Sequence, residues 1–229
     1  MKKRLVVLTG AGVSAESGIK TFRDNDGLWE NHDVMEVASA AGWKNNPALI
    51  LDFYNQRRKQ LATTQPNEAH KILAELEEHF DVHIVTQNVD NLHERAGSTN
   101  VLHLHGELTK ARSVWNEERI YDIGYEDIRM GQLAEDGGQL RPHIVWFGES
   151  VPLIMEAEKL TWSADFFAAI GTSLVVYPAA GLAQRLPENV KAFLVDPNAD
   201  ESQIPDNFTI IKEPATKGMA KMRDLLLAI

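Results

Sequence analysis

The chain of 229 residues carries 33 acidic and 23 basic residues, which gives a formal net charge of −10, and it contains no cysteine. This length, with 44% hydrophobic residues, predicts a globular chain of one large domain or a large domain with a small insertion. The acidic balance argues against a nucleic-acid partner, and the lack of cysteine excludes disulfides, thiolate catalysis and cysteine-bound zinc. Because no apolar run is long enough for a secretory leader or a membrane span, we expect a cytoplasmic protein.

Short apolar runs rich in β-branched residues alternate with helix-like segments along the chain. Helices are expected over Pro47–Leu61, over Pro66–Phe80 behind an Asn67 cap, and over Met219–Ile229. The expected strands are Leu5–Leu8, Val82–Thr86, Ile144–Phe147, Phe166–Ile170 and Ala192–Val195. This alternation predicts an α/β fold with a parallel sheet that is covered by helices on both faces.

Two segments interrupt the alternation. Residues from about 20 to 61 hold a loop and a helical stretch without an intervening strand. Residues 107–141 are polar, contain four glycines and lack a clear period. We interpret both segments as insertions that build a smaller second lobe over the sheet.

The first expected strand leads directly into the glycine-rich run Gly10-Ala11-Gly12-Val13-Ser14-Ala15. Glycines at such a junction allow a tight turn and let backbone N–H groups approach a pyrophosphate at a helix N-terminus. The run fits G-x-G-x-x-A, a variant of the dinucleotide fingerprint. A glycine-rich turn without a ligand is the alternative.

Polar residues follow the second expected strand in the run Thr86–Asn91, where ligands bind in open α/β sheets. Alone, this run could also be a helix cap formed by Asn88 or Asp90. The next polar run is His103-Leu104-His105-Gly106. Two histidines on one side of a strand could bind a metal, satisfy buried hydrogen bonds or act in acid–base chemistry, and the residues alone leave all three open.

Five motifs, in the same order and over nearly the whole chain, resemble those of the sirtuins. They are Gly10–Ile19 continuing through Thr21-Phe22-Arg23, then Gln87–Asp90, His103–Gly106, Arg141–Glu149 and Gly171–Pro178. Five ordered motifs are far more specific than one fingerprint. The resemblance implies a single catalytic domain over residues 1–229, built on a Rossmann-like parallel sheet with a smaller inserted lobe.

The resemblance implies an NAD-dependent protein-lysine deacylase that yields nicotinamide, O-acyl-ADP-ribose and free lysine, with acylated proteins as its partners. His105 matches the family's catalytic base, and imidazole is suited to take a proton from a ribose hydroxyl near neutral pH. The residues expected to bind NAD are Gly10, Ala11, Gly12, Ser14, Ala15, Ile19, Phe22, Arg23, Trp29, Gln87, Asn88, Asp90, Gly171, Thr172, Ser173, Asp196, Pro197, Asn198 and Ala215. The residues expected to bind the acyl-lysine substrate are Tyr54, Arg57, Val145, Phe147 and Gly148.

The chain departs from the family pattern in two places. Many sirtuins carry four zinc-binding cysteines in the segment that corresponds to 107–141, so we expect no metal here. We expect apolar packing to hold this segment together instead, through Val114, Trp115, Ile120, Tyr121 and Tyr125. The second departure is Asp196, where the family usually has asparagine, and a carboxylate can still accept from ribose hydroxyls.

An arginine interrupts the apolar stripe of the helix expected at 47–61. Ile50, Phe53, Tyr54 and Leu61 share one face with Arg57, so Arg57 must be paired or must extend to solvent. Tyr54-x-x-Arg57 also resembles the acyl-pocket pair of the sirtuin class that accepts succinyl- and malonyl-lysine. In that class the arginine binds the distal carboxylate and the tyrosine adds a hydrogen bond.

Three other functions stay open from the sequence. The glycine-rich turn alone fits an NAD-dependent oxidoreductase, although this leaves His105 and the run Gln87–Asp90 unexplained. A binding module without catalysis would leave the intact His105 unexplained. Transfer of ADP-ribose to protein would use the same activated ribose.

Overall fold

The computed structural model describes residues 2–20, 28–29, 32–174 and 176–229. Its centre is a sheet of six parallel strands in the order β11-β10-β9-β1-β4-β5. The strands are β1 (Arg4–Thr9), β4 (Asp81–Thr86), β5 (Val101–His103), β9 (Phe166–Ile170), β10 (Lys191–Val195) and β11 (Phe208–Ile211). The chain winds outward from β1 first to β4 and β5, and then returns to β9 on the other side of β1. This is the order of a doubly wound dinucleotide-binding sheet, with its switch point between β1 and β9.

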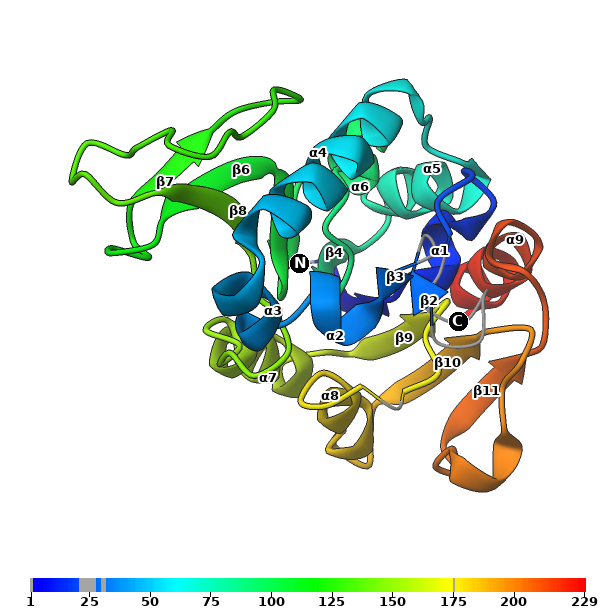
Figure 1. Cartoon of the computed structure of the whole chain (residues 1–229). Helices are drawn as coiled ribbons and strands as arrows, with labels where there is room; N and C mark the ends of the chain where they lie inside the picture. Colours follow the sequence, from blue (N-terminus) through cyan, green and yellow to red (C-terminus); the bar gives the residue numbers. More distant parts are fainter. Residues whose placement is uncertain (1, 21–27, 30–31, 175) are drawn as a thin grey trace.

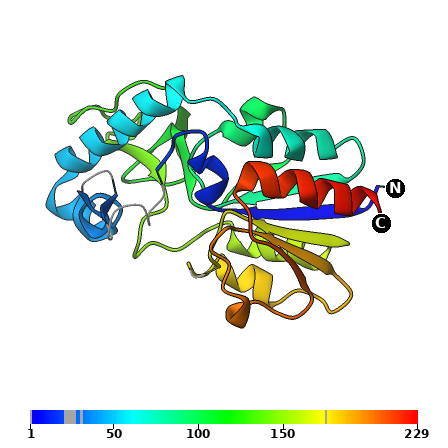
Figure 2. The same ribbon diagram turned by 90° about the vertical axis from the view of Figure 1, so that its right-hand side faces the viewer.

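Helices cover both faces of this sheet, as predicted (Figures 1 and 2). Alternate residues of β1 point to opposite faces. Leu5 and Val7 pack with α5 (Glu68–Leu76) and α9 (Ala215–Leu227), whereas Val6 and Leu8 pack with α7 (Ile154–Trp162) and α8 (Ala180–Gln184). Since both faces of β1 are fully buried, its sequence is a continuous apolar run and not an alternating one.

Two of these helices lie where the sequence predicts them, but their ends differ from the predicted bounds. The Asn67 side chain accepts a hydrogen bond from the backbone of Ala69 at 2.9 Å, which confirms the predicted cap of α5. The helix ends at Leu76 and not at Phe80. Helix α9 begins at Ala215, four residues before the predicted start, and Pro214 is its N-cap residue.

A second, smaller lobe is built from segments that lie between the strands of the large sheet (Figure 1). It holds a three-stranded antiparallel sheet in the order β7-β6-β8, and a two-stranded hairpin, β2-β3. Its strands are β2 (Leu28–Trp29), β3 (His32–Asp33), β6 (Gly106–Ser113), β7 (Ile120–Asp122) and β8 (Leu140–Ile144). Its helices are α2 (Val34–Val37), α3 (Ala40–Asn45) and α4 (Pro47–Thr63). The remaining short elements of the chain are α1 (Gly12–Ala15), α6 (Leu92–Ala96) and the 3-10 turn η1 (Glu201–Gln203).

Two strand predictions are corrected in this lobe. The predicted strand Ile144–Phe147 is wrong, since β8 ends at Ile144 and the next residues leave the sheet. The backbone N–H groups of Val145 and Phe147 bond to the carbonyls of His105 and Ala38, so they make no ladder. The expectation of no strand between residues 20 and 61 is also wrong, because the β2-β3 hairpin lies there.

Of the residues predicted to form the interior of the small lobe, only Tyr121 packs against the apolar cluster found there, so most of that prediction is wrong. Trp115 is 72% exposed and Ile120 is 48% exposed, so neither side chain can hold the lobe together, and Tyr125 is exposed too. The apolar interior consists instead of Leu51, Ala111, Ile128, Ala134 and Leu140, against which Tyr121 packs. Most of these residues are small or isolated in the sequence, which explains why no periodic pattern reveals them.

Within this lobe Arg58 joins α4 to β6 and to the segment around Glu126, and it has no exposed surface. Its guanidinium donates to the backbone carbonyls of Glu126 at 2.9 Å and Leu108 at 3.3 Å, and to the Asn55 side chain. Burial lowers the pKa of Arg58 to about 10, which still leaves it charged at neutral pH. The hydrogen bonds of Arg58 therefore stabilise the small lobe in addition to its small apolar interior.

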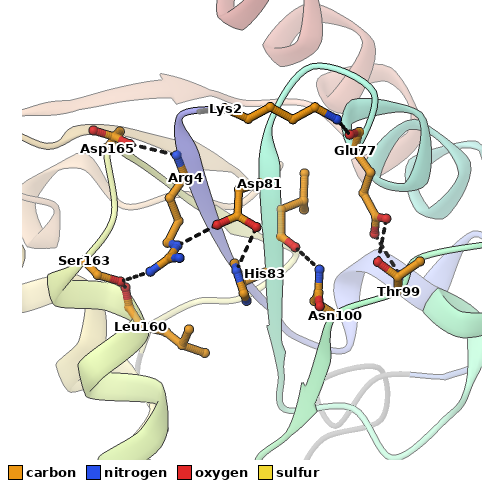
Figure 3. Close-up of polar contacts among 11 residues, drawn as sticks. Lys2, Arg4, Glu77, Asp81, His83, Thr99, Asn100, Leu160, Ser163 and Asp165 are labelled. Atoms are coloured by element: carbon orange, nitrogen blue, oxygen red, sulfur yellow. Dashed lines mark hydrogen bonds and ion pairs between the residues drawn. The ribbon is translucent and has the colours of Figure 1, made fainter.

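Polar side chains tie together the amino ends of the central strands (Figure 3). Arg4 on β1 contacts Asp81 on β4 at 2.9 Å and donates to the Ser163 hydroxyl at 2.8 Å. The hydrogen bond from Arg4 lowers the pKa of the Asp81 carboxyl. Because ligands of open α/β sheets bind at the opposite, carboxyl ends, we interpret these contacts as structural. Across the described ranges, no helix combines the length and apolarity that a membrane span needs.

Candidate functional site

A cavity of about 580 Å³ opens at the carboxyl ends of the central strands, next to the small lobe. Its size suits a small-molecule site, since such sites enclose roughly 300–1,000 Å³. It extends from the end of β10 past the switch point to α4. The predicted residues that line it are Gly10, Ala11, Gly12, Ser14, Ala15, Ile19, Tyr54, Arg57, Gln87, Asn88, Asp90, His105, Val145, Phe147, Gly148, Gly171, Thr172, Ser173, Asp196, Pro197, Asn198 and Ala215.

Three further predicted residues cannot be placed in the cavity. Phe22 and Arg23 lie outside the described residues. Trp29 belongs to β2 by its backbone, but its side chain is outside the description.

Two glycine-containing loops meet at the switch point. The Gly12 N–H donates to the Gly171 carbonyl at 2.9 Å, and the Gly10 N–H donates to Ile170 at 3.0 Å. A Cβ added at Gly12 would lie 2.7 Å from the Gly171 Cα. Gly171 has φ +59°, and a Cβ there would lie 2.2 Å from the Val13 nitrogen. The glycines are therefore required for contact between the loops themselves, in addition to any approach by a ligand.

A buried polar network forms one wall behind the glycine-rich loop. The Ser14 hydroxyl donates to Asp90 Oδ2 at 3.1 Å and accepts from Asn88 Nδ2 at the same distance. Asp90 Oδ1 accepts from the Leu92 N–H at 3.1 Å, so Asp90 both lines the cavity and caps the start of α6. Burial raises the pKa of the Asp90 carboxyl. The two interpretations of this run, cap and site, are compatible.

His105 and His103 have different environments although only one residue separates them. His105 lines the cavity, and its Nδ1 lies 3.0 Å from the Gln87 carbonyl. A carbonyl can only accept, so Nδ1 carries the hydrogen and Nε2 is the basic nitrogen. Burial lowers the pKa of His105 below its usual 6.5, although the Gln87 carbonyl opposes this.

His103 is buried and lies with Nε2 2.6 Å from a Glu94 oxygen and Nδ1 3.3 Å from the Asn88 carbonyl. Burial opposes the charged form of His103, but the hydrogen bond to Glu94, the charges of Glu94 and Glu107 and the Asn88 carbonyl together outweigh burial and raise the pKa of His103. Among the residues that the structure describes, no three His, Asp or Glu side chains form a group that could hold a metal. The two histidines therefore correspond to different alternatives: His103 forms a structural ion pair, and His105 is placed for acid–base chemistry.

Tyr54 and Arg57 lie one turn apart on α4 and line the same cavity as His105. The Tyr54 hydroxyl accepts a hydrogen bond from the Trp146 indole at 3.0 Å. Burial raises the pKa of Tyr54 to about 12, so the phenol stays protonated at neutral pH. Arg57 is only 7% exposed, and its guanidinium lies 5.7 Å from the centre of the Phe53 ring. A buried positive charge therefore sits in the wall of the cavity.

The residues present fit a dinucleotide. At one end, Asp196 follows β10 and accepts from the Asn198 N–H at 2.8 Å, which holds a carboxylate where ribose hydroxyls could donate to it. In the middle, Gly10–Gly12 and Gly171–Ser173 present backbone and small side chains that a pyrophosphate can approach. The amide and hydroxyl groups of Gln87, Asn88 and Ser14 lie beyond them.

The cavity also contains residues that the sequence prediction missed. Trp146 and Glu149 lie within the Arg141–Glu149 motif, so their position next to Val145 and Phe147 was the available signal. Val176, Tyr177 and Pro178 lie likewise within the Gly171–Pro178 motif. Glu16, Lys20, Val89 and Ile144 also lie within the motif segments, whereas Ala38, Val151 and Pro214 lie outside every motif and carry no sequence signal.

Comparisons with known proteins agree with this geometry. The model of the Sir2 family matches residues 10–178. An NAD-dependent protein deacylase of Helicobacter pylori (strain ATCC 700392 / 26695) is 55% identical over 225 residues, which cover 98% of each chain. An enzyme of the same name from Bacteroides thetaiotaomicron is 50% identical over 230 residues, again covering 98% of each chain.

Solved structures of the family superpose on the whole chain. A complex of a Sir2 homologue with NAD has a TM-score of 0.86 at 35% identity and covers 99% of this chain and 90% of its own. A complex described as Sir2, p53 peptide and NAD⁺ has a TM-score of 0.81 at 29% identity and covers 100% and 95%. The predicted fold class, a Rossmann-like sheet with a smaller lobe, is confirmed by these matches.

Proposed function

This chain belongs to the Sir2 family, and on that premise we propose that it is an NAD-dependent protein-lysine deacylase whose acyl pocket accepts acidic acyl groups. One observation carries the proposal: a single cavity contains the dinucleotide-type loops, a histidine with its basic nitrogen available, and a buried arginine one turn from a tyrosine. An oxidoreductase would use the loops alone. The residues 1–229 act in this proposal as one catalytic unit, with residues 20–61 and 107–141 forming the small lobe.

The cofactor would lie between Asp196 and Asn88. When bound, NAD⁺ supplies an activated ribose carbon that can accept the acyl oxygen of the substrate. The protein's part is to hold and orient. Asp196 accepts from the adenosine-side hydroxyls, the loops at Gly10 and Gly171 admit the phosphates, and the Ser14–Asp90–Asn88 network holds the wall of the nicotinamide pocket.

His105 acts as the general base. Its Nδ1–H is engaged by the Gln87 carbonyl, which fixes the ring and leaves Nε2 to take a proton from a ribose hydroxyl. Because burial lowers its pKa, His105 is neutral and ready to accept at physiological pH. Gly106 has φ +80°, and a Cβ there would lie 2.0 Å from the His143 carbonyl, so glycine is needed for the chain directly after His105 to lie this close to β8.

Arg57 and Tyr54 select the acyl group. A guanidinium in the wall of a buried cavity can bind a distal carboxylate through two parallel hydrogen bonds, and such a site favours succinyl- or malonyl-lysine. Acetyl-lysine offers no carboxylate, so it would enter the pocket without using the charge. The substrates are therefore acylated proteins, with acetyl groups accepted less well than dicarboxylic ones.

The test compares acetyl-, malonyl- and succinyl-lysine peptides of one sequence, each with NAD⁺, and identifies the products by mass. We expect loss of the acyl group from each peptide, at higher efficiency for malonyl and succinyl, together with free nicotinamide. Reduction of NAD⁺ without loss of acyl groups would support the oxidoreductase alternative. A peptide heavier by one ADP-ribose would support transfer to protein, which uses the same activated ribose.

A further inference from the structure

The turn after β8 forms the wall of the cavity beside the acyl pocket. Val145, Phe147 and Gly148 line the cavity here, and the turn closes with a hydrogen bond from the Glu149 N–H to the Trp146 carbonyl at 3.0 Å. Its outer edges are bonded to neighbours, since the Val145 N–H donates to His105 and the Phe147 N–H donates to Ala38. The turn thus has a defined backbone but belongs to no sheet.

Glu149 folds back under this turn and binds it to two buried arginines. Its carboxylate lies 2.6 and 3.2 Å from two nitrogens of Arg141, in a bidentate pair. The oxygen Oε2 also accepts from Arg112 at 3.2 Å and from the Trp146 N–H at 3.0 Å. Arg112 and Arg141 are both nearly inaccessible to solvent. One carboxylate therefore binds two buried cations and fixes the backbone of the turn at the same time, and Arg112 also lies 3.6 Å from a second carboxylate, that of Glu117.

The same cluster reaches the acyl pocket through Trp146. The Arg141 guanidinium lies 3.4 Å from the centre of the Trp146 ring, stacked on it. The indole N–H of Trp146 donates to the Tyr54 hydroxyl at 3.0 Å. The chain of contacts runs from Glu149 through Arg141 and Trp146 to Tyr54, so the position of the tyrosine depends on the ion cluster.

We propose that Glu149, held by Arg112 and Arg141, is a positioning residue for acyl-lysine binding, which sets both the substrate-facing turn and the Tyr54 hydroxyl. The inference rests on the proposed function. The role of Glu149 is confined to the peptide side of the cavity, because none of these contacts reaches the Gly10–Gly12 or Gly171–Ser173 loops. In a small lobe without cysteine-bound zinc, this cluster is the device that holds the peptide wall in place.

The principal test is Glu149→Gln, which keeps the size of the side chain but removes the charge and one acceptor from the bidentate pair. Hydrogen bonds to charged groups are strong enough that we expect the KM for an acyl-lysine peptide to rise roughly tenfold. We expect kcat at saturating peptide and the KM for NAD⁺ to stay within about threefold. A purely structural role would instead lower the active fraction, so that kcat falls and the peptide KM stays unchanged.

The matched control is Glu135→Gln on the same lobe, where an exposed carboxylate lies 3.1 Å from Arg119. It should change neither KM, because exposed ion pairs contribute little. A second readout is the indole N–H signal of Trp146 in a ¹⁵N spectrum, assigned with Trp146→Phe. It should shift in Glu149→Gln, whereas the signal of exposed Trp162 on α7 should not.

If Glu149→Gln does not fold, Arg112→Met takes its place, since it removes one contact and leaves the Arg141 pair intact. It should raise the peptide KM by a smaller factor, roughly threefold. An unchanged peptide KM and an unchanged Trp146 signal in an active variant would contradict the inference alone. Failure of the wild-type chain to deacylate any peptide would instead contradict the proposed function.

Discussion

At the scale of single residues, hydrogen-bond partners separate two histidines that the sequence presents together. Both nitrogens of His103 face acceptors, a carboxylate and a carbonyl, so His103 is held in its charged form. His105 faces one carbonyl through Nδ1, which leaves Nε2 for chemistry. The resemblance to the sirtuins pointed to His105, but residue types and spacing alone could not separate the two histidines. The contacts with Glu94 and Gln87 depend on how α6 and β4 meet β5.

His105→Ala should reduce deacylation by about 100- to 10,000-fold, the usual contribution of a general base. NAD⁺ binding should change little, because the loops at Gly10 and Gly171 do not contact the imidazole. The assay is the initial rate with one acyl peptide, with NAD⁺ affinity measured in parallel by titration. Near-normal turnover by the folded variant would remove His105 from the mechanism.

The pH dependence of activity should follow the lowered pKa of His105. A general base must be neutral to accept a proton. Because burial lowers the pKa of His105, the imidazole becomes protonated only below pH 6.5. Activity should therefore stay level as the pH falls from 8 to about 6.5 and decline only below it. A profile of kcat/KM against pH checks this, and an acidic limb with its midpoint above 6.5 would contradict the assignment.

Arg57→Met should change specificity without changing the fold. Methionine keeps the apolar face of α4, but it removes a charge-assisted bidentate contact that contributes roughly 1.5–3 kcal/mol. Desuccinylation efficiency should fall on the order of 10- to 100-fold, while deacetylation stays level or improves. Tyr54→Phe should act in the same direction with a smaller loss. Equal losses for both acyl groups, with a lower melting temperature, would make Arg57 a structural residue.

At the scale of elements, helix α4 carries two adjacent buried arginines with different tasks. Arg57 faces the cavity, whereas Arg58 faces the small lobe and donates to backbone carbonyls there. Successive side chains of a helix point in directions about 100° apart, so the two arginine side chains face different surroundings. A substitution of Arg58 therefore serves as a control for the same substitution of Arg57.

Arg58→Met should destabilise the protein and leave acyl specificity unchanged. The change removes the donor from the buried Leu108 carbonyl, which costs about 1–3 kcal/mol, and from the part-buried Glu126 carbonyl, which costs less because water can reach it. The melting temperature should fall by several degrees, while the ratio of succinyl to acetyl efficiency stays that of the wild type. A stable variant with an altered ratio would place Arg58, and not Arg57, in the acyl pocket.

Elements with a strong local pattern could be predicted from the sequence, and the rest could not. Strands β1, β9 and β10 are apolar runs buried on both faces, β4 buries Val82, Ile84 and Val85 around a partly exposed His83, and α5 has a cap and an apolar stripe. The strands of the small lobe are short or irregular. In β6 the pairing with β8 shifts between Glu107 and Ala111, which removes the period-two pattern.

The site was predictable to the extent that motifs carried it. Each predicted cofactor and substrate residue with a described side chain lines the cavity, because the motifs lie at the ends of the central strands. Ala38, Val151 and Pro214 reach the same cavity from segments without a motif. Trp115 shows the opposite error. It was assigned to the interior because the segment 107–141 has few other apolar residues, but it is exposed, and the interior consists of smaller side chains.

At the scale of the whole molecule, the two lobes divide the task between them. The large sheet provides the two glycine loops at its switch point, and the small lobe provides α4 and the turn after β8. In the proposed function, the cavity between them joins the cofactor side to the acyl side through His105. An acidic chain with a net charge of −10 also suits basic, lysine-containing protein substrates.

The most direct test of this account measures all products of one reaction. The chain is incubated with NAD⁺ and a succinyl-lysine peptide, and nicotinamide, free-lysine peptide and O-succinyl-ADP-ribose are quantified by mass over time. The account predicts that the three appear in equal amounts, because the acyl group moves to the ribose each time nicotinamide leaves. Reduced cofactor, or free-lysine peptide without a matching amount of nicotinamide, would contradict it.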